Sequence, residues 1–353
     1  MVRKNNSAGI SLVFAVLLCS CGSNYRKGYS EIEVEEKIFR NATPVEYSSI
    51  SGENDFVHAK QLFVISDSII LASNRPGADY FIDFYDLETK RLLTKYIRSG
   101  NGPGEALNCD SSVSDGTVYV NDFVRKELLM VNIDSALNDG NYKVPSYPYS
   151  HGKTIPSISG RGDSVYFLNP YCLEYKPYHT GKPRYFSAKK FHELPDDAFN
   201  HRLNTFNVSQ GELLVKPGGG TIAFFSLNYP FVEFYSSPES PYLRINFPSN
   251  IEQKFRTEGN EVIFNGFIHY TFTGASCDDE YLYGAYVDDV LTRERDMEAF
   301  STYIVKMNWC GDILGCYFFP YCITSLSKTQ STLYGKVERA GIPYIYKITL
   351  PKS

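Results

Sequence analysis

The stretch SVSDGTVYVND, residues 112–122, indicates the fold. It places an acidic turn residue before a run of apolar residues, the pattern of a β-strand that follows a turn. Two other stretches repeat it, VISDSIILAS at 64–73 and SGRGDSVYFLN at 159–169. The turn aspartates lie 48 residues apart each time: Asp67, Asp115 and Asp163. A period of this length is typical of a protein built from repeated structural units.

The repeat continues towards the C-terminus at wider spacing. The later copies read PGGGTIAFFSL (217–227), CDDEYLYGAY (277–286) and KTQSTLYGKV (328–337). A second strand type, which alternates apolar and polar residues, follows most copies: 80–89, 126–135, 229–238, 301–312 and 342–350. RLLTKYIR and ILGCYFFP then follow two of these strands, as a hairpin requires. Each unit is therefore a strand, a turn, and two or three more antiparallel strands.

Six such units fit a chain of 353 residues. We therefore predict an all-β fold, a six-bladed β-propeller with four-stranded antiparallel blades. The last unit is short of a strand, and EIEVEEKIF at 31–39 is strand-like and unassigned. We expect this N-terminal strand to close the ring by pairing in the last blade. The predicted organisation is a lipoprotein signal peptide at 1–20, a lipidated tether at 21–29 and a single propeller at 30–353.

Composition agrees with a strand-rich fold and argues against a nucleic-acid partner. The chain has 28 Tyr and 24 Phe against a single Trp, and Tyr and Phe favour half-buried sheet surfaces. Its net charge is −5, and its 35 basic residues are scattered. Binding to nucleic acid requires a concentrated basic surface, so we expect no nucleic-acid partner.

The N-terminus reads as a secretion signal. Arg3 and Lys4 precede the apolar stretch GISLVFAVLL at 9–18, which is too short to span a bilayer as a mature helix. The residues that follow, Leu18 to Cys21, resemble a bacterial lipobox, in which the final cysteine is lipidated. Cys21 fits this position better than Cys19, and an ordinary secretory signal is the alternative. We expect an outer-membrane lipoprotein that faces the periplasm and reaches the membrane through its lipid anchor only.

The turn YIRSGNGPGE, residues 96–105, carries glycines that could suggest a phosphate-binding loop. Such a loop ends in Lys-Ser or Lys-Thr and opens a helix. Here those residues are absent, Pro103 removes one N–H group, and strand patterns lie on both sides. We therefore interpret this stretch as a structural crossing between blades, made by Gly100, Gly102, Pro103, Gly104 and Glu105.

The same turn also carries a family resemblance. Arg98 followed by GNGPGE resembles the signature of the TolB-like six-bladed β-propeller lipoproteins of Gram-negative gut-type bacteria. The stretches TGASCDDEYLYGAY (273–286) and YIVKMNWCGDIL (303–314) are similar to two further stretches of that family. Ser99, Cys310 and Cys316 depart from its pattern. The resemblance implies a propeller architecture and an envelope location, and it implies no agreed activity.

Few residues of the sequence suggest a catalytic, metal-binding or disulfide-forming role. His192, Asp196 and His201 are weak metal candidates because they lie in the one cluster of acidic and histidine residues. The alternative is a solvated loop, and we assign no metal, no cofactor and no catalytic residue. Cys310, Cys316 and Cys322 are close enough in sequence for one disulfide, although buried thiols are the favoured interpretation.

The sequence favours a non-enzymatic binding module over an enzyme. The expected partner is an unidentified envelope protein or a glycan, bound at the concave face that propeller loops form. The loops at 170–204 and 287–300 are the longest, so we expect contacts there. The alternative is a periplasmic enzyme, either a lactonase-like metal propeller or a glycan lyase or hydrolase. A purely structural envelope component is a third possibility, and oligomeric state is not indicated.

Overall fold

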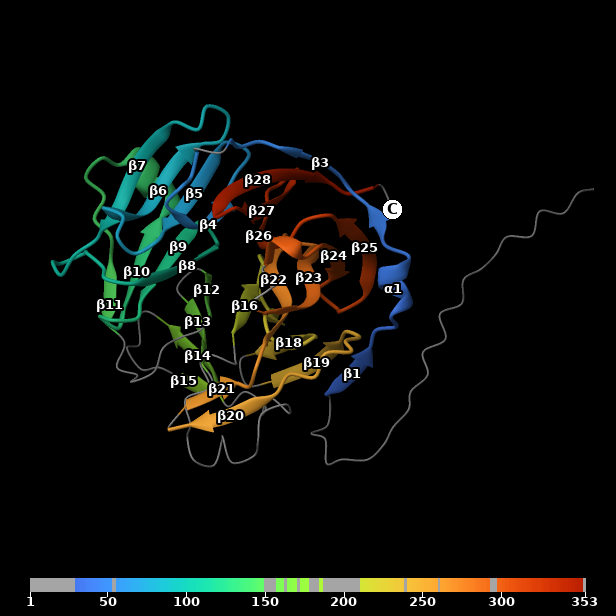
Figure 1. The fold of residues 1–353 in the computed structure, drawn as a ribbon. Coiled ribbons are helices and arrows are strands. Elements are labelled where there is room, and N and C mark those ends of the chain that lie inside the picture. Colours follow the sequence, from blue (N-terminus) through green and yellow to red (C-terminus); the bar gives the residue numbers. More distant parts are fainter. Residues whose placement is uncertain are drawn as a thin grey trace, which may run out of the picture.

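The computed structural model describes residues 29–52, 55–148, 210–237, 240–259, 261–292 and 297–351, together with the strands between 157 and 186. The chain is an all-β β-propeller, whose sheets stand around a central axis (Figure 1). The signal peptide, the proposed lipidation site Cys21 and the weak metal candidates lie outside the described residues. No helix in the described part is long and apolar enough to cross a membrane.

Five blades have described hydrophobic cores. The first blade comprises β4 (Ala59–Val64), β5 (Ile69–Asn74), β6 (Tyr80–Asp86) and β7 (Leu92–Arg98), and the second comprises β8 (Cys109–Ser114), β9 (Thr117–Asp122), β10 (Glu127–Asn132) and β11 (Ser146–Pro148). Two more blades comprise β16 (Gly211–Val215), β17 (Ile222–Ser226), β18 (Phe231–Ser237) and β19 (Ser240–Asn246), and β22 (Ile268–Cys277), β23 (Tyr281–Leu291), β24 (Thr302–Asn308) and β25 (Ile313–Phe319). The last blade comprises β26 (Ile323–Lys328), β27 (Leu333–Arg339) and β28 (Ile342–Thr349). Within each blade, successive strands pair antiparallel.

A further four-stranded antiparallel sheet is described by its backbone pairing. It comprises β12 (Ser157–Arg161), β13 (Ser164–Asn169), β14 (Cys172–Pro177) and β15 (Arg184–Phe186). Its first strand, β12, lies beside β8 and β16. The remaining short elements are α2 (Ile133–Asn138), the hairpin β20 (Phe255–Glu258) with β21 (Glu261–Phe264), and the 3₁₀ turn Met297–Ala299.

The repeat found in the sequence is confirmed as the second strand of each sheet. The six copies become β5, β9, β13, β17, β23 and β27. In the second blade, Asp115 and Gly116 both have positive φ, 48° and 68°, between the paired residues Ser114 and Thr117. Positive φ at both central residues is the signature of the tight hairpin turn whose twist matches that of the strands. The alternating strand type is also confirmed, as β6, β10, β18, β24 and β28.

The N-terminal residues form a strap, defined here as residues 30–49, along the outer edges of three blades. It comprises β1 (Ser30–Glu33), the single-turn helix α1 (Lys37–Arg40), β2 (Thr43–Pro44) and β3 (Glu46–Ser49). β1 pairs parallel with β19, β2 pairs parallel with β25, and β3 pairs antiparallel with β28. In Figure 1 the strap is the blue segment that runs along the rim beside β19, β25 and β28. Because a bare edge strand is a template for aggregation, the strap protects these three edges.

The prediction of a six-bladed ring of uniform four-stranded blades, closed by residues 31–39, is wrong. The structure describes five blades with cores, and two of these sheets have five strands because β1 and β2 join them. Residues 31–33 pair with β19 rather than with the last blade, and residues 37–40 are helical. Only the later strand β3 reaches the last sheet. The sequence pattern showed that the segment was strand-like, but it could not show which of several exposed edges would accept it.

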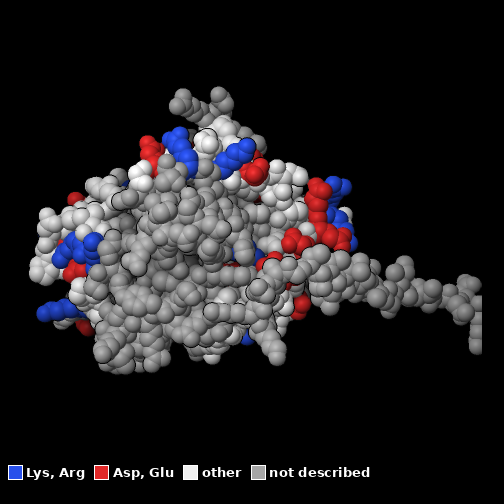
Figure 2. Space-filling model, turned by 90° about the horizontal axis from the view of Figure 1, so that it is seen from below, with Lys and Arg blue, Asp and Glu red and all other residues white. Residues whose placement is uncertain are grey.

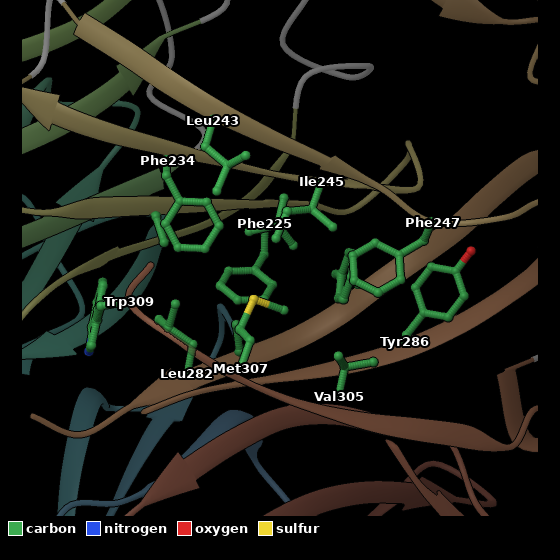
Figure 3. Packing of buried hydrophobic residues seen from close by; sticks show 14 of the residues in the cluster. Phe225, Phe234, Leu243, Ile245, Phe247, Leu282, Tyr286, Val305, Met307 and Trp309 are labelled. Atoms are coloured by element: carbon green, nitrogen blue, oxygen red, sulfur yellow. The ribbon is translucent and has the colours of Figure 1, made fainter. Parts of the chain in front are cut away.

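Adjacent blades are held together by aromatic and aliphatic side chains. Between the β16–β19 and β22–β25 blades, Phe272 packs against Phe225 and Phe247, with ring centroids 5.3 and 5.1 Å apart. Figure 3 shows Phe225, Phe247 and Tyr286 converging there with Met307 and Val305. Similar described cores join β22–β25 to β26–β28, β26–β28 to β4–β7, and β4–β7 to β8–β11.

Five cysteines with described side chains are free thiols. Cys109, Cys316 and Cys322 are buried, Cys277 is half-buried and Cys310 is exposed. No disulfide therefore links Cys310, Cys316 and Cys322, and burial raises the pKa of the Cys316 and Cys322 thiols to about 12. Their role in this structure is to fill space in the core.

Phe39 tests whether the strap is part of the packed fold. Its ring stacks on Tyr286 at 5.0 Å and contacts Tyr303 at 4.8 Å. We expect Phe39→Ala to lower the free energy of unfolding by about 2 kcal/mol, less than for a fully buried ring because Phe39 is only partly buried. Chemical denaturation measures the change. The control is Lys37→Ala on the same helix, which removes an exposed ion pair and is expected to cost less than about 0.5 kcal/mol. Equal effects of the two substitutions would contradict this packing.

Candidate functional site: the axial channel

The first strand of each blade faces the axis and encloses a channel. β4, β8, β16, β22 and β26 all contribute to a cavity of about 860 Å³. The inner position of these strands follows from the fold, since the sheets of a propeller radiate from a central channel. A volume of this size lies within the usual range for small-molecule sites, roughly 300–1,000 Å³. The channel is therefore the candidate functional site.

The channel wall combines apolar side chains with a set of hydroxyl and amide side chains. The latter include Asn108, Ser111, Ser112, Asn121, Ser276 and Ser327. Phe63 and Tyr119 add aromatic surface. Such side chains recognise ligands by hydrogen bonds and ring contacts, without requiring charge. No histidine is present among the described residues that line the channel.

Polar contacts between blades fix the geometry of this wall. Ser73 and Ser111 join the first two blades through hydroxyl oxygens 2.8 Å apart. The last blade is joined to the first where Val64 N–H donates to Ser327 Oγ at 3.1 Å and Lys336 Nζ donates to the Lys60 carbonyl oxygen at 2.6 Å. Burial lowers the pKa of Lys336, and the nearby Glu338 carboxylate opposes this shift. These contacts hold the inner strands at a defined separation and keep the channel open.

The charged side chains of the wall are largely paired. Lys60 forms an ion pair with Asp110 across the first two blades. Lys328 Nζ lies 3.5 Å from Asp278 Oδ2 and donates to the Gln330 carbonyl oxygen at 3.1 Å. On the outer surface, Lys and Arg side chains lie beside Asp and Glu side chains over the described part of the face in Figure 2.

Glu212 is an acidic residue of the wall that forms no ion pair among the described residues. Gly211 lets β16 approach β17 closely, since a Cβ there would lie 2.2 Å from the Phe225 carbonyl oxygen. The next residue, Glu212, then reaches β22, where its Oε2 accepts a hydrogen bond from Ala275 N–H. Burial raises the pKa of Glu212 to about 8, and the Ala275 N–H group partly offsets the shift. Its carboxyl group is therefore mostly protonated at neutral pH.

The sequence reasoning did not single out Glu212. The available signal was the stretch QGELLV, in which an acidic residue occupies an otherwise apolar strand. Among the described residues, no group of three His, Cys, Asp or Glu side chains converges as a metal site would require. The weak metal candidates His192, Asp196 and His201 lie outside the described residues.

The glycine-rich turn lies between β7 and β8, where the chain passes from the first blade to the second. Gly102 N–H donates to Glu105 Oε2 at 2.6 Å, and a Cβ on Gly102 would lie only 2.9 Å from that oxygen. Glu105 thus occupies the place where a phosphate loop would bind an anion. Arg125 Nη1 donates to the carbonyl oxygens of Gly102 and Glu105 at 2.7 and 2.6 Å. Gly100, Pro103 and Gly104 complete this turn.

The fold and the channel define this chain as a β-propeller. No family model and no curated protein matches it. Among solved structures it is similar to a member of the DUF4221 family from Bacteroides vulgatus, with a TM-score of 0.58 and 9% identity over 88% of this chain and 98% of that one. It is also similar to a candidate exported protein from Bacteroides fragilis, with a TM-score of 0.54 and 8% identity over 91% of this chain and 99% of that one. At these identities, the similarity shows the fold.

Arg125 tests the structural account of the turn. We expect Arg125→Ala to lower the free energy of unfolding by about 2 kcal/mol, because two carbonyl oxygens lose a charged donor. Arg125→Lys should restore less than half of this, since one ammonium group cannot reproduce the guanidinium geometry. Denaturant titration measures both. Lys143→Ala, an exposed change, is the control; a loss no larger than the control's would show that the turn does not depend on Arg125.

Glu212 predicts a pH dependence of stability. Its pKa is about 8 in the folded chain and about 4.5 ordinarily, so the folded state keeps the proton that the unfolded state releases. The stabilisation that protonated Glu212 gives the folded state is fully present below about pH 4.5, and it is lost as pH rises to about 8. The slope stays below about 1.4 kcal/mol per pH unit because a single carboxyl group binds at most one proton. Glu212→Gln should remove this slope, measured by denaturant titration between pH 5 and 8. Identical pH profiles for the two proteins would refute the assignment.

Proposed function

We propose that this protein is a binding module of the bacterial cell envelope, in which the axial channel and its mouth bind a glycan or a segment of a partner protein. The observation that carries this proposal is the channel itself, a cavity of about 860 Å³ whose wall sets hydroxyl and amide side chains among apolar ones. Such a wall satisfies the hydrogen bonds of a polar ligand at many points. Rigid inner strands supply these side chains, so little ordering is needed on binding.

The proposed location follows from the N-terminus. A lipid on Cys21 would anchor the chain, and residues 22–29 would tether the propeller, which we place at the outer membrane facing the periplasm. The resemblance to TolB-like lipoproteins supports this assignment. The Bacteroides fragilis neighbour is named as an exported protein, and this agrees with a location outside the cytoplasm.

Partner capture tests the proposed function. The tagged, lipidated full chain would be cross-linked gently in cell envelopes and purified, and the recovered proteins and glycans would be identified by mass spectrometry. Gln210→Trp places a large ring in the channel wall, at a residue that lines the cavity. We expect it to reduce recovery of the bound partner by about tenfold, which corresponds to about 1.4 kcal/mol of binding free energy.

The matched control adds the same ring elsewhere. Leu314→Trp lies on the outer strand β25, where Leu314 is 45% exposed. Recovery with this variant should equal that of the unaltered protein. Equal recovery with both variants would show that the partner does not use the channel, and failure to recover any protein or glycan would contradict a binding function.

A further inference from the structure

One carboxyl oxygen in the channel is available to a ligand. Glu212 Oε2 is held by Ala275 N–H, whereas Oε1 has no hydrogen-bond partner among the described residues. Glu212 lines the channel and is only partly buried. A carboxyl group inside a protein is costly unless it is hydrogen-bonded. The arrangement therefore leaves an unused hydrogen-bonding atom on a residue that lines the cavity.

The described side chains of the strands that pack against β16 do not supply Glu212 with a compensating charge. β22 packs against β16 and brings Cys277, whose thiol pKa burial raises to about 12, and six residues before Ala275 it carries His269, which is paired with Asp288 at 2.9 Å. β17 contributes no ionisable side chain. The side chains of β12, which also packs against β16, lie outside the described residues.

The charge balance of the wall indicates the class of ligand. Lys60 is paired with Asp110 and Lys328 with Asp278, so these groups attract neither an anion nor a cation strongly. A charged ligand would need to break one of these pairs or to leave its own charge unmatched in the channel, and both cost free energy. A neutral ligand that carries many hydroxyl groups meets the serine, asparagine and glutamine side chains without that cost.

We propose that the channel binds a segment of a neutral oligosaccharide and that the free oxygen of Glu212 is its central hydrogen-bonding contact. This inference rests on the proposed function and narrows it to one ligand class. With Oε2 accepting from Ala275 N–H, a protonated Oε1 can donate its O–H to one sugar hydroxyl and accept from another through its own lone pair. Phe63, which is partly buried, offers aromatic surface for the apolar side of a sugar. The cavity volume leaves room for more than one sugar ring.

Isothermal titration calorimetry on the mature full chain tests this inference. The neutral probes are mannotriose, cellotriose and xylotriose. A cationic trimer of glucosamine and anionic trigalacturonate serve as probes of matched length. At least one neutral trisaccharide should bind, and it should bind about tenfold more tightly than either charged probe.

Substitution at Glu212 then separates its role from that of the channel. We expect Glu212→Ala to weaken binding of the neutral trisaccharide by about tenfold, whereas Glu212→Gln, which keeps a neutral donor and acceptor, should weaken it by about threefold or less. Thermal denaturation of each variant shows whether it is folded. A contact that depended on a carboxylate charge would be lost equally in both variants.

The outcomes distinguish this inference from the proposed function. Binding of a neutral trisaccharide that is unchanged in Glu212→Ala overturns the role of Glu212. Preference for a charged probe, or no binding of any probe, overturns the ligand class. If no trisaccharide binds while envelope capture still recovers a channel-dependent partner protein, the proposed function stands and this inference falls.

Discussion

The packing of one blade face against the next is the interaction on which the rest of the structure depends. Phe272 inserts between Phe225 and Phe247 of the preceding blade and also contacts Tyr286 at 5.0 Å. Gly284 faces this cluster, and a Cβ there would lie 2.8 Å from the Phe225 ring. Hydrophobic area buried in this way is the dominant favourable term in folding. Because blades are wedged together by such rings, their inner strands cannot meet at the axis and a channel remains.

The composition of the inner strands follows from this geometry. Side chains packed between blades are largely apolar, whereas several serines of the inner strands form hydrogen bonds to the neighbouring blade. Ser111, Ser325 and Ser327 show this, since each hydroxyl makes a hydrogen bond to the adjacent blade. Glu212 uses the same geometry to reach Ala275, but only one of its two oxygens is used. The unused oxygen of Glu212 thus results from the way in which the inner strands of adjacent blades pack together.

Local patterns in the sequence predicted the strands well because each strand is specified by its own residues. Asp115 and Gly116 define a tight turn, and the apolar run after them can only form a buried strand. The sequence did not show in the same way which blade edge each strand of the strap would pair with. Residues 31–33 were recognised as strand-like, yet their parallel pairing with β19 depends on an edge formed by residues more than 200 positions later.

The candidate site was harder to predict than the fold. The serines and asparagines of the channel come from strands scattered over the chain, and nothing local distinguishes them from surface residues. Glu212 stands in a short apolar strand, and its raised pKa results from burial that only the assembled blades create. The glycine-rich turn was interpretable because its chemistry is local: Gly102, Glu105 and the turn between them lie within four residues.

A crystal structure of the mature chain soaked with the best-bound neutral trisaccharide would test the central claim most directly. The account predicts sugar density inside the channel, with a hydroxyl oxygen within hydrogen-bonding distance, about 2.5–3.0 Å, of Glu212 Oε1. Ser276 and Phe63 should lie along the same ligand. Sugar density confined to the outer rim, with the channel occupied by water alone, would contradict it.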